Sequence, residues 1–183
     1  MTTEALRYTA FSTDPAGGNP AGVVLDASEL SDTDMQRIAK EVGYSETAFL
    51  TRTADRAYRV RYFSPLAEVD FCGHATIATS VALAERIGAG SLVFRTNTGD
   101  VTIETAPGTA TLTSVAPYSR PATEAEIMDT LRALRWQRTD VTPAFPARVA
   151  YAGNEHLMLA AATRTRLATL DYDFDALGSI MRA

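Results

Sequence analysis

The chain has 183 residues, of which 46% are hydrophobic, so it can bury the core of one large domain or of two small ones. Its net charge of -5 is small and its acidic and basic residues are interspersed, so neither nucleic acid nor a membrane surface is predicted as a partner. The single cysteine, Cys72, excludes an internal disulfide, and with only two histidines the chain is poor material for a thiolate-rich zinc site.

Residues 1–7 lack the basic segment and apolar stretch of a secretion signal, and no window has the length of a membrane span. We therefore expect a soluble, cytoplasmic protein.

Strands are predicted at 6–11 and 21–25, on either side of a loop rich in Gly and Pro at 14–20.

A short amphipathic helix is predicted next, because Ser31 and Asp34 resemble a capping box and Gly43 is placed to end the helix. The apolar residues between them recur with helical spacing: Met35, Ile38, Ala39 and Val42. Two strands are predicted after it, at 46–50 and 58–63.

The segment Phe71–Thr76 (FCGHAT) leads from a strand-like block into a helical pattern at 77–87, which Gly88 ends. The start of a helix has unpaired N–H groups and a partial positive charge, so the segment predicts a site for a small carboxylate near Gly73 and His74. The alternative is that the glycine only permits a tight turn. Because this helix is apolar on most sides, we expect it to be wrapped by a sheet, as in a barrel around a central helix.

A meander of three strands is predicted at 92–96, 101–105 and 109–113, followed by a helix that Thr123 begins and that runs through Leu134. A Pro-spaced stretch then places a domain boundary near residue 145. The predicted domains are therefore 1–145 and 146–183.

Beyond that boundary an earlier pattern returns. Gly18-Asn19, followed by a strand and a helix, recurs as Gly153-Asn154, a strand at 157–161 and a helix at 174–181. This indicates an internal duplication with an incomplete second copy. A unit of fewer than about 40 residues is seldom stable alone, so we expect the second lobe to be completed downstream or by another chain.

Four ordered blocks now identify a resemblance: Gly18-Asn19-Pro20-Ala21, Ser45–Phe49, Phe63-Ser64-Pro65 and Cys72–Thr76. Together they resemble the PhzF-like phenazine-biosynthesis isomerases, and residues 151–157 resemble the start of that family's second lobe. The resemblance implies an α+β, diaminopimelate-epimerase-like fold with two similar lobes. Each lobe would be a mostly antiparallel barrel around a central helix, with the active site in the cleft between the lobes.

By the same resemblance, Glu46 matches the catalytic carboxylate, and Gly73 and His74 match substrate-contacting positions. A carboxyl group can accept and then return a proton, while helix amides and an imidazole N–H can stabilise the developing negative charge. The resemblance implies neither an organic cofactor nor a metal. It suggests a homodimer, and a separate chain carrying the missing lobe is the other arrangement we consider.

Three further residues are candidates for the substrate site. Cys72 is predicted to be a small residue lining the pocket, because the chain has no second cysteine for the thiol pair that related epimerases use. Asn19 could contact substrate or only hold its turn, and Asp70 could tune His74 or face solvent. His156 is assigned to a strand surface.

The leading hypothesis is an isomerase that shifts a proton on a small unsaturated carboxylic acid through Glu46, in the biosynthesis of a specialised metabolite. The alternative is a catalytically incomplete protein of the same fold that binds a small acid or a partner. The second lobe's acidic and Ser/Thr/Gly-rich site residues have no counterpart in this sequence, and that observation motivates the alternative.

Overall fold

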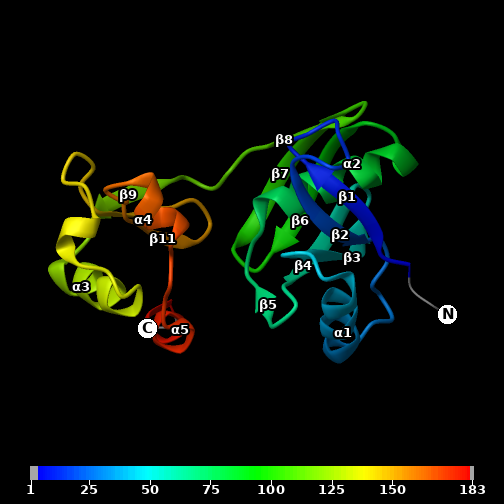
Figure 1. Cartoon of the computed structure of the whole chain (residues 1–183). Coiled ribbons are helices and arrows are strands. Elements are labelled where there is room, and N and C mark those ends of the chain that lie inside the picture. Colours follow the sequence, from blue (N-terminus) through cyan, green and yellow to red (C-terminus); the bar gives the residue numbers. More distant parts are fainter. Residues whose placement is uncertain (1–3, 182–183) are drawn as a thin grey trace. The chain divides into compact units, whose positions relative to one another are not determined.

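The computed structural model describes residues 4–181, and the chain divides into two compact units between Val115 and Ala116 (Figure 1). This corrects the boundary predicted near 145. The boundary lies earlier because strand β9 (Tyr118–Pro121) pairs with β10 (Arg148–Tyr151). The residues between these two strands therefore belong to the second unit.

The first unit contains one curved sheet. Its strands are β1 (Leu6–Ala10), β2 (Asn19–Val24), β3 (Thr47–Ala54), β4 (Ala57–Phe63), β5 (Glu68–Val69), β6 (Gly90–Thr96), β7 (Gly99–Ala106) and β8 (Thr109–Leu112). They lie in the order β1-β2-β3-β4-β6-β7-β8, with β5 beside β4. Most neighbours are antiparallel, and β2 with β3 and β4 with β6 are the parallel pairs. The predicted strands and meander are confirmed.

Helix α2 (Gly73–Ile87) lies inside the curve of this sheet. It contacts β1, β2 and β3 at one end of the strand order and β7 and β8 at the other, so the sheet wraps around it. Its fully buried residues are small, which lets the strands approach the helix closely: Ala75, Thr76, Ala78, Thr79, Ser80 and Ala82. The expectation of a central helix wrapped by a sheet is confirmed, although the helix begins at Gly73 rather than at Ile77.

Helix α1 (Asp32–Val42) covers the other face of the sheet. Successive side chains of β3 point to opposite faces of the sheet. Ala48 and Leu50 pack in the core with α2, whereas Phe49 packs with α1 on the other face. The predicted capping box is present at Ser31, and Gly43 ends the helix in the left-handed region at φ 72°.

An ion-pair network joins α1 to β4 and β5, with Arg61 and Glu68 partly buried and Asp32 exposed. The Arg61 guanidinium donates two hydrogen bonds to the Glu68 carboxylate, at 2.8 and 2.7 Å, and a third to Asp32 at 2.5 Å. The paired arrangement is a strong one for Arg and carboxylate. The two hydrogen bonds from Arg61 lower the pKa of the Glu68 carboxyl below its usual range.

The network predicts an acid-sensitive contribution to stability. The folded-state pKa of Glu68 is lowered, so its contribution is complete above the unfolded value of about 4.5 and is lost as pH falls through the folded pKa. We therefore expect Glu68→Gln to lower the free energy of unfolding at pH 7. Below about pH 4.5 the difference between the variant and the unmodified chain should close. Urea unfolding from pH 7 to pH 3 measures it, and a constant difference would contradict the assignment.

The second unit contains a three-stranded antiparallel sheet in the order β11-β10-β9, where β11 is Glu155–Met158. Its helices are α3 (Glu124–Ala133), a 3-10 turn at Arg138–Asp140, α4 (Arg164–Ala168) and α5 (Phe174–Met181). The strand and helix of the second copy occur in the predicted order, as β11 and α5. The strand begins at residue 155 rather than at 157, and α4 lies between the two elements. Gly18 and Gly153, which open the two copies, both have positive φ.

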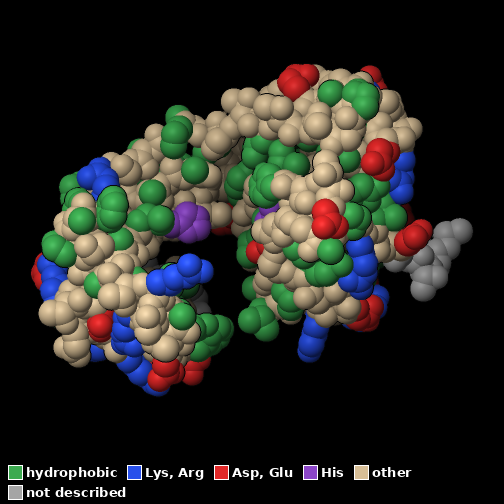
Figure 2. All heavy atoms as spheres, turned by 45° about the horizontal axis from the view of Figure 1, so that its top comes forward, with side chains coloured by type: hydrophobic (Ala, Val, Ile, Leu, Met, Phe, Trp, Pro, Cys, Tyr) green, Lys and Arg blue, Asp and Glu red, His purple; other side chains and the backbone are tan. Residues whose placement is uncertain are grey.

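Among residues 4–181, no helix combines the length and the apolar character needed to cross a membrane. On the face of the molecule shown in Figure 2, acidic and basic side chains are interspersed. The surface in view therefore carries no large region of a single charge, in keeping with the composition.

Candidate active site

Glu46 lies in the short link between α1 and β3, one residue before the strand begins. Its backbone is held by the neighbouring strand, because the Gly22 N–H donates a hydrogen bond to the Glu46 carbonyl at 3.0 Å. The next residue, Thr47, is fully buried and begins the parallel pairing with β2. Glu46 is thus placed by a rigid sheet rather than by a free loop.

Cys72 and His74 lie at the start of α2, where Cys72 is the N-cap residue and makes no side-chain capping hydrogen bond. The Cys72 carbonyl accepts the Thr76 N–H at 3.0 Å, so the first turn is regular. The FCGHAT segment therefore forms the beginning of the helix itself.

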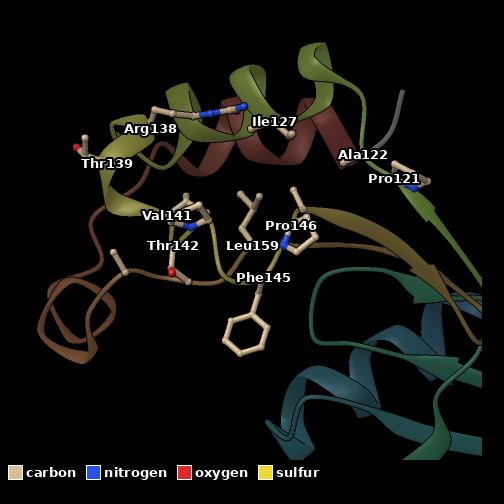
Figure 3. A pocket seen from close by; sticks show the side chains of 13 residues that line it. Pro121, Ala122, Ile127, Arg138, Thr139, Val141, Thr142, Phe145, Pro146 and Leu159 are labelled. Atoms are coloured by element: carbon tan, nitrogen blue, oxygen red, sulfur yellow. The ribbon is translucent and has the colours of Figure 1, made fainter.

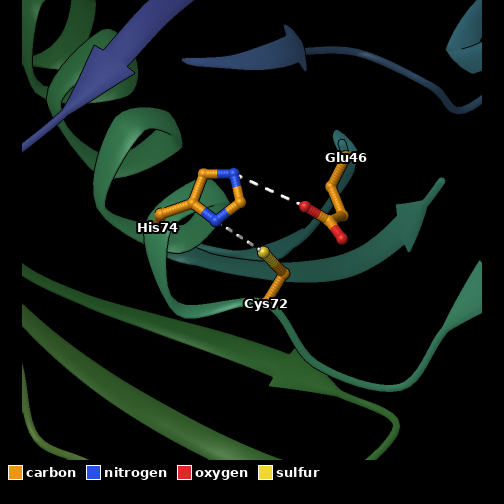
Figure 4. Close-up of side chains that lie close together, drawn as sticks. All are labelled: Glu46, Cys72 and His74. Carbon is orange, nitrogen blue, oxygen red and sulfur yellow. Dashed lines mark hydrogen bonds and ion pairs between the residues drawn. The ribbon is translucent and has the colours of Figure 1, made fainter. Parts of the chain in front are cut away.

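Glu46, Cys72 and His74 form one cluster, which we call the acid–base cluster (Figure 4). His74 Nε2 lies 3.5 Å from Glu46 Oε2, and His74 Nδ1 lies 3.2 Å from Cys72 Sγ. The His74 side chain is 10% exposed and that of Glu46 is 21% exposed. The imidazole is therefore held between a carboxylate and a thiol, and the carboxylate remains accessible to a small molecule.

Burial raises the pKa of the Cys72 thiol to about 12, and the nearby Glu46 carboxylate acts in the same direction. The Ala75 and His74 backbone N–H groups at the start of the helix oppose this shift only in part. Cys72 thus stays a thiol at neutral pH. The three side chains are donor types that bind divalent ions, but a protonated thiol is a poor ligand.

Gly73 has no structural reason to be glycine. Its φ is not positive, and a Cβ added there would meet nothing within 4 Å. Within residues 4–181 its N–H has no hydrogen-bond partner. The tight-turn explanation for this glycine is therefore wrong, and the open space at the helix start suits a ligand that approaches the backbone.

A buried chain of hydroxyl groups supports the helix start. Thr76 Oγ1 donates to the Cys72 carbonyl at 2.7 Å, so its single hydrogen is used. The fully buried Tyr62 hydroxyl, 2.6 Å away, must then donate to Thr76. Sequence reasoning assigned no role to Tyr62 or Thr76, and the only available signal was the position of Thr76 within the motif.

The hydroxyl chain of Tyr62 and Thr76 predicts that substitutions at these two residues have unequal effects on stability. Tyr62→Phe should lower the free energy of unfolding by about 1 kcal/mol, the value of one buried hydrogen bond. Thr76→Val should cost about 1–3 kcal/mol, because it leaves the Tyr62 hydroxyl buried without its acceptor. Denaturant unfolding of both variants and of the double variant measures this, and simple additivity in the double variant would contradict the coupling.

The other sequence candidates lie outside the acid–base cluster. Asn19 is exposed at the start of β2, and Asp70 is exposed and accepts a hydrogen bond from Asn97 at 3.4 Å. Within residues 4–181, no hydrogen bond or ion pair joins either side chain to the cluster. His156 is exposed on β11, as predicted. Ser45, to which no role was assigned, places Oγ 3.4 Å from His74 Nε2.

The second unit has an open apolar pocket of about 790 Å³ (Figure 3). Ile127 of α3, Val141, Phe145 and Leu159 are among its lining residues. Its single charged side chain, Arg138, is paired with Glu124 at 3.0 Å. The pocket therefore offers apolar surface but no group suited to acid–base chemistry.

Comparisons with known proteins bear on the family and the fold of this chain. The family model of the PhzC-PhzF phenazine biosynthesis-like proteins matches residues 8–182. An uncharacterized isomerase, YddE of Escherichia coli K12, is 35% identical over 189 residues, which cover 100% of this chain and 64% of that protein. The chain thus spans somewhat less than two thirds of the length of this relative.

Two solved structures extend the comparison. A PhzF-family phenazine biosynthesis protein from Bacillus anthracis matches with a TM-score of 0.72 and 30% identity, covering 97% of this chain and 62% of that one. A predicted epimerase from Pseudomonas aeruginosa matches with a TM-score of 0.82 and 22% identity, covering 97% and 66%, and so bears on the fold alone. The expected fold class is confirmed, and the chain belongs to the PhzC-PhzF family of phenazine biosynthesis-like proteins.

Proposed function

We propose that this chain provides the proton-transfer half of a cofactor-independent isomerase that acts on a small unsaturated carboxylic acid. One observation carries the proposal: an accessible Glu46 carboxylate lies 3.5 Å from a buried imidazole at the start of a helix. The naming of relatives as isomerases supports the reaction class.

In the proposed reaction, the Glu46 carboxylate removes a proton from a carbon next to the double bond. The electron pair of the broken C–H bond spreads into the unsaturated system as a dienolate. The Glu46 carboxyl then returns the proton to a different carbon, so the double bond moves and nothing is oxidised or reduced.

The groups around Glu46 suit the charge changes of that reaction. An N–H of His74 can donate to the dienolate oxygen as negative charge develops there. The N–H of Gly73, which has no hydrogen-bond partner among the described residues, and the dipole of α2 can hold the substrate carboxylate. Acid–base transfer and charge stabilisation would then act on one bound molecule.

Solvent deuterium exchange tests the proposal. The unmodified chain is incubated in deuterated buffer with trans-3-hexenedioate or 2,5-cyclohexadiene-1-carboxylate, both of which conjugate after a proton shift. Deuterium uptake into carbon-bound positions above the uncatalysed rate, read by proton NMR, is the expected result. No uptake into either acid would count against turnover by this chain.

Binding without turnover is the second candidate. The observation that favours it is that the chain spans 64% of the relative's length, so side chains from elsewhere could be required for the reaction. Binding of the same acids by calorimetry, without exchange, would identify it.

The homodimer or complementing second-lobe chain also remains a prediction, which native mass spectrometry would test.

A further inference from the structure

The His74 ring has different partners at its two nitrogens. Nδ1 faces the Cys72 thiol at 3.2 Å, and Nε2 faces the Glu46 carboxylate at 3.5 Å and Ser45 Oγ at 3.4 Å. A neutral imidazole carries one hydrogen and one lone pair on these nitrogens. The neighbours therefore decide which nitrogen carries the hydrogen.

The donors and acceptors around the ring favour one of the two neutral tautomers of His74. An ionised carboxylate can only accept, so the nitrogen facing Glu46 must carry the hydrogen. The hydroxyl of Ser45 can accept or donate and fits either arrangement. Nδ1 is then left as an acceptor, and the thiol of Cys72 is the donor within reach.

We infer that Cys72 is a positioning residue, whose S–H donates to Nδ1 of His74 and holds the neutral ring as the Nε2–H tautomer. The inference deepens the proposed function and rests on it. With Nε2–H fixed, the ring presents a donor to the carboxylate and to the dienolate. The other tautomer would present a lone pair to both negative groups.

The surroundings of the sulfur support its role as donor. The Glu46 carboxylate is a second acceptor near the thiol hydrogen, but Glu46 also faces Nε2–H of His74, whereas the thiol is the donor that Nδ1 has at 3.2 Å. Burial keeps the thiol protonated by raising its pKa. Cys72 and His74 also lie on the same first turn of α2, so the helix fixes the separation of sulfur and ring.

Imidazole NMR tests the inference directly on the full chain labelled with ¹⁵N. The chain has only two histidines, so His156→Gln assigns both rings, and the exposed His156 serves as an internal reference. At about pH 8.5, where an ordinary imidazole is neutral, we expect His74 to have an unprotonated Nδ1 and a protonated Nε2. A doubly protonated ring or an Nδ1–H tautomer would overturn the inference.

Two substitutions separate donation from packing. Cys72→Ser keeps a donor and should keep the Nε2–H tautomer, whereas Cys72→Ala should shift His74 toward a mixture of tautomers. Deuterium exchange by Cys72→Ala should be about three- to tenfold slower than by Cys72→Ser, the effect of one neutral hydrogen bond. Equal tautomer ratios in the two variants would also overturn the inference. Absence of exchange in the unmodified chain, with the tautomer as expected, would instead reject the proposed function alone.

Discussion

Glu46→Gln is expected to lower solvent-to-substrate deuterium transfer by about 10²- to 10⁴-fold, the usual contribution of a positioned acid–base group. Glutamine keeps the size of the side chain and its carbonyl oxygen opposite His74, but it cannot take up or return a proton at neutral pH. Exchange rates of the variant and of the unmodified chain, measured on the same two acids, give the ratio.

The matched control is Glu41→Gln, because Glu41 is an exposed carboxylate on the surface of α1 whose one ion pair within residues 4–181 is with Arg37. It should exchange at the unmodified rate. Binding of the two acids by Glu46→Gln should change only a few-fold, since the α2 amide and the His74 ring are untouched. Exchange by Glu46→Gln at the unmodified rate would remove Glu46 from the reaction.

Local signals in the sequence located the elements of the first unit well. The capping box at Ser31 and the glycines at 43 and 88 mark helix ends through hydrogen bonding and backbone conformation, which neighbouring residues determine. The start of α2 was less visible. The sequence marks residues 73–76 only as a junction, because the pattern of large apolar residues begins at Ile77.

The division of the chain was not predictable in the same way. β9 and β10 are four residues each, carry arginines and, in β9, a proline, so neither has the apolar alternation that indicates a strand. They exist because they pair with each other across residues 122–147. Pairing at that sequence distance leaves no periodic pattern to read.

At the site, the motif residues predicted the cluster but not its internal geometry. Gly73 and His74 are predicted by the helix-start pattern as well as by the resemblance, Glu46 by the resemblance alone, and the structure places Glu46 beside His74. The two-sided contacts of the imidazole and the Tyr62–Thr76 chain depend on side-chain rotamers. Spacing in a sequence determines which face a residue occupies, and rotamers follow only from packing.

Gly22→Ala is expected to damage both the fold and the reaction, although Gly22 is not a member of the acid–base cluster. A Cβ at this position would lie 2.9 Å from Thr47 Cγ2, still closer to Thr47 Oγ1, and 3.0 Å from Val42 Cγ1. Thr47 is fully buried and cannot move freely. Overpacking of this kind lowers the free energy of unfolding by about 1–3 kcal/mol.

The effect on the reaction follows from the backbone. Gly22 N–H holds the Glu46 carbonyl, and Thr47 is the next residue, so we expect relief of the clash to change the position of Glu46 relative to His74. A shift of about 1 Å can cost about 10²-fold in rate, and we expect a loss of that order in deuterium exchange. Denaturant unfolding and the exchange assay measure the two effects separately.

Thr47→Ala provides the decisive companion variant. Thr47 Oγ1 has no hydrogen-bond partner among the described residues, so its removal breaks no hydrogen bond, and it also removes both Thr47 atoms that crowd position 22. The double variant Gly22→Ala/Thr47→Ala should therefore recover stability and exchange relative to Gly22→Ala alone. If stability returned while exchange stayed low, the Gly22 contact would matter for folding only, and the placement of Glu46 would have to depend on other contacts.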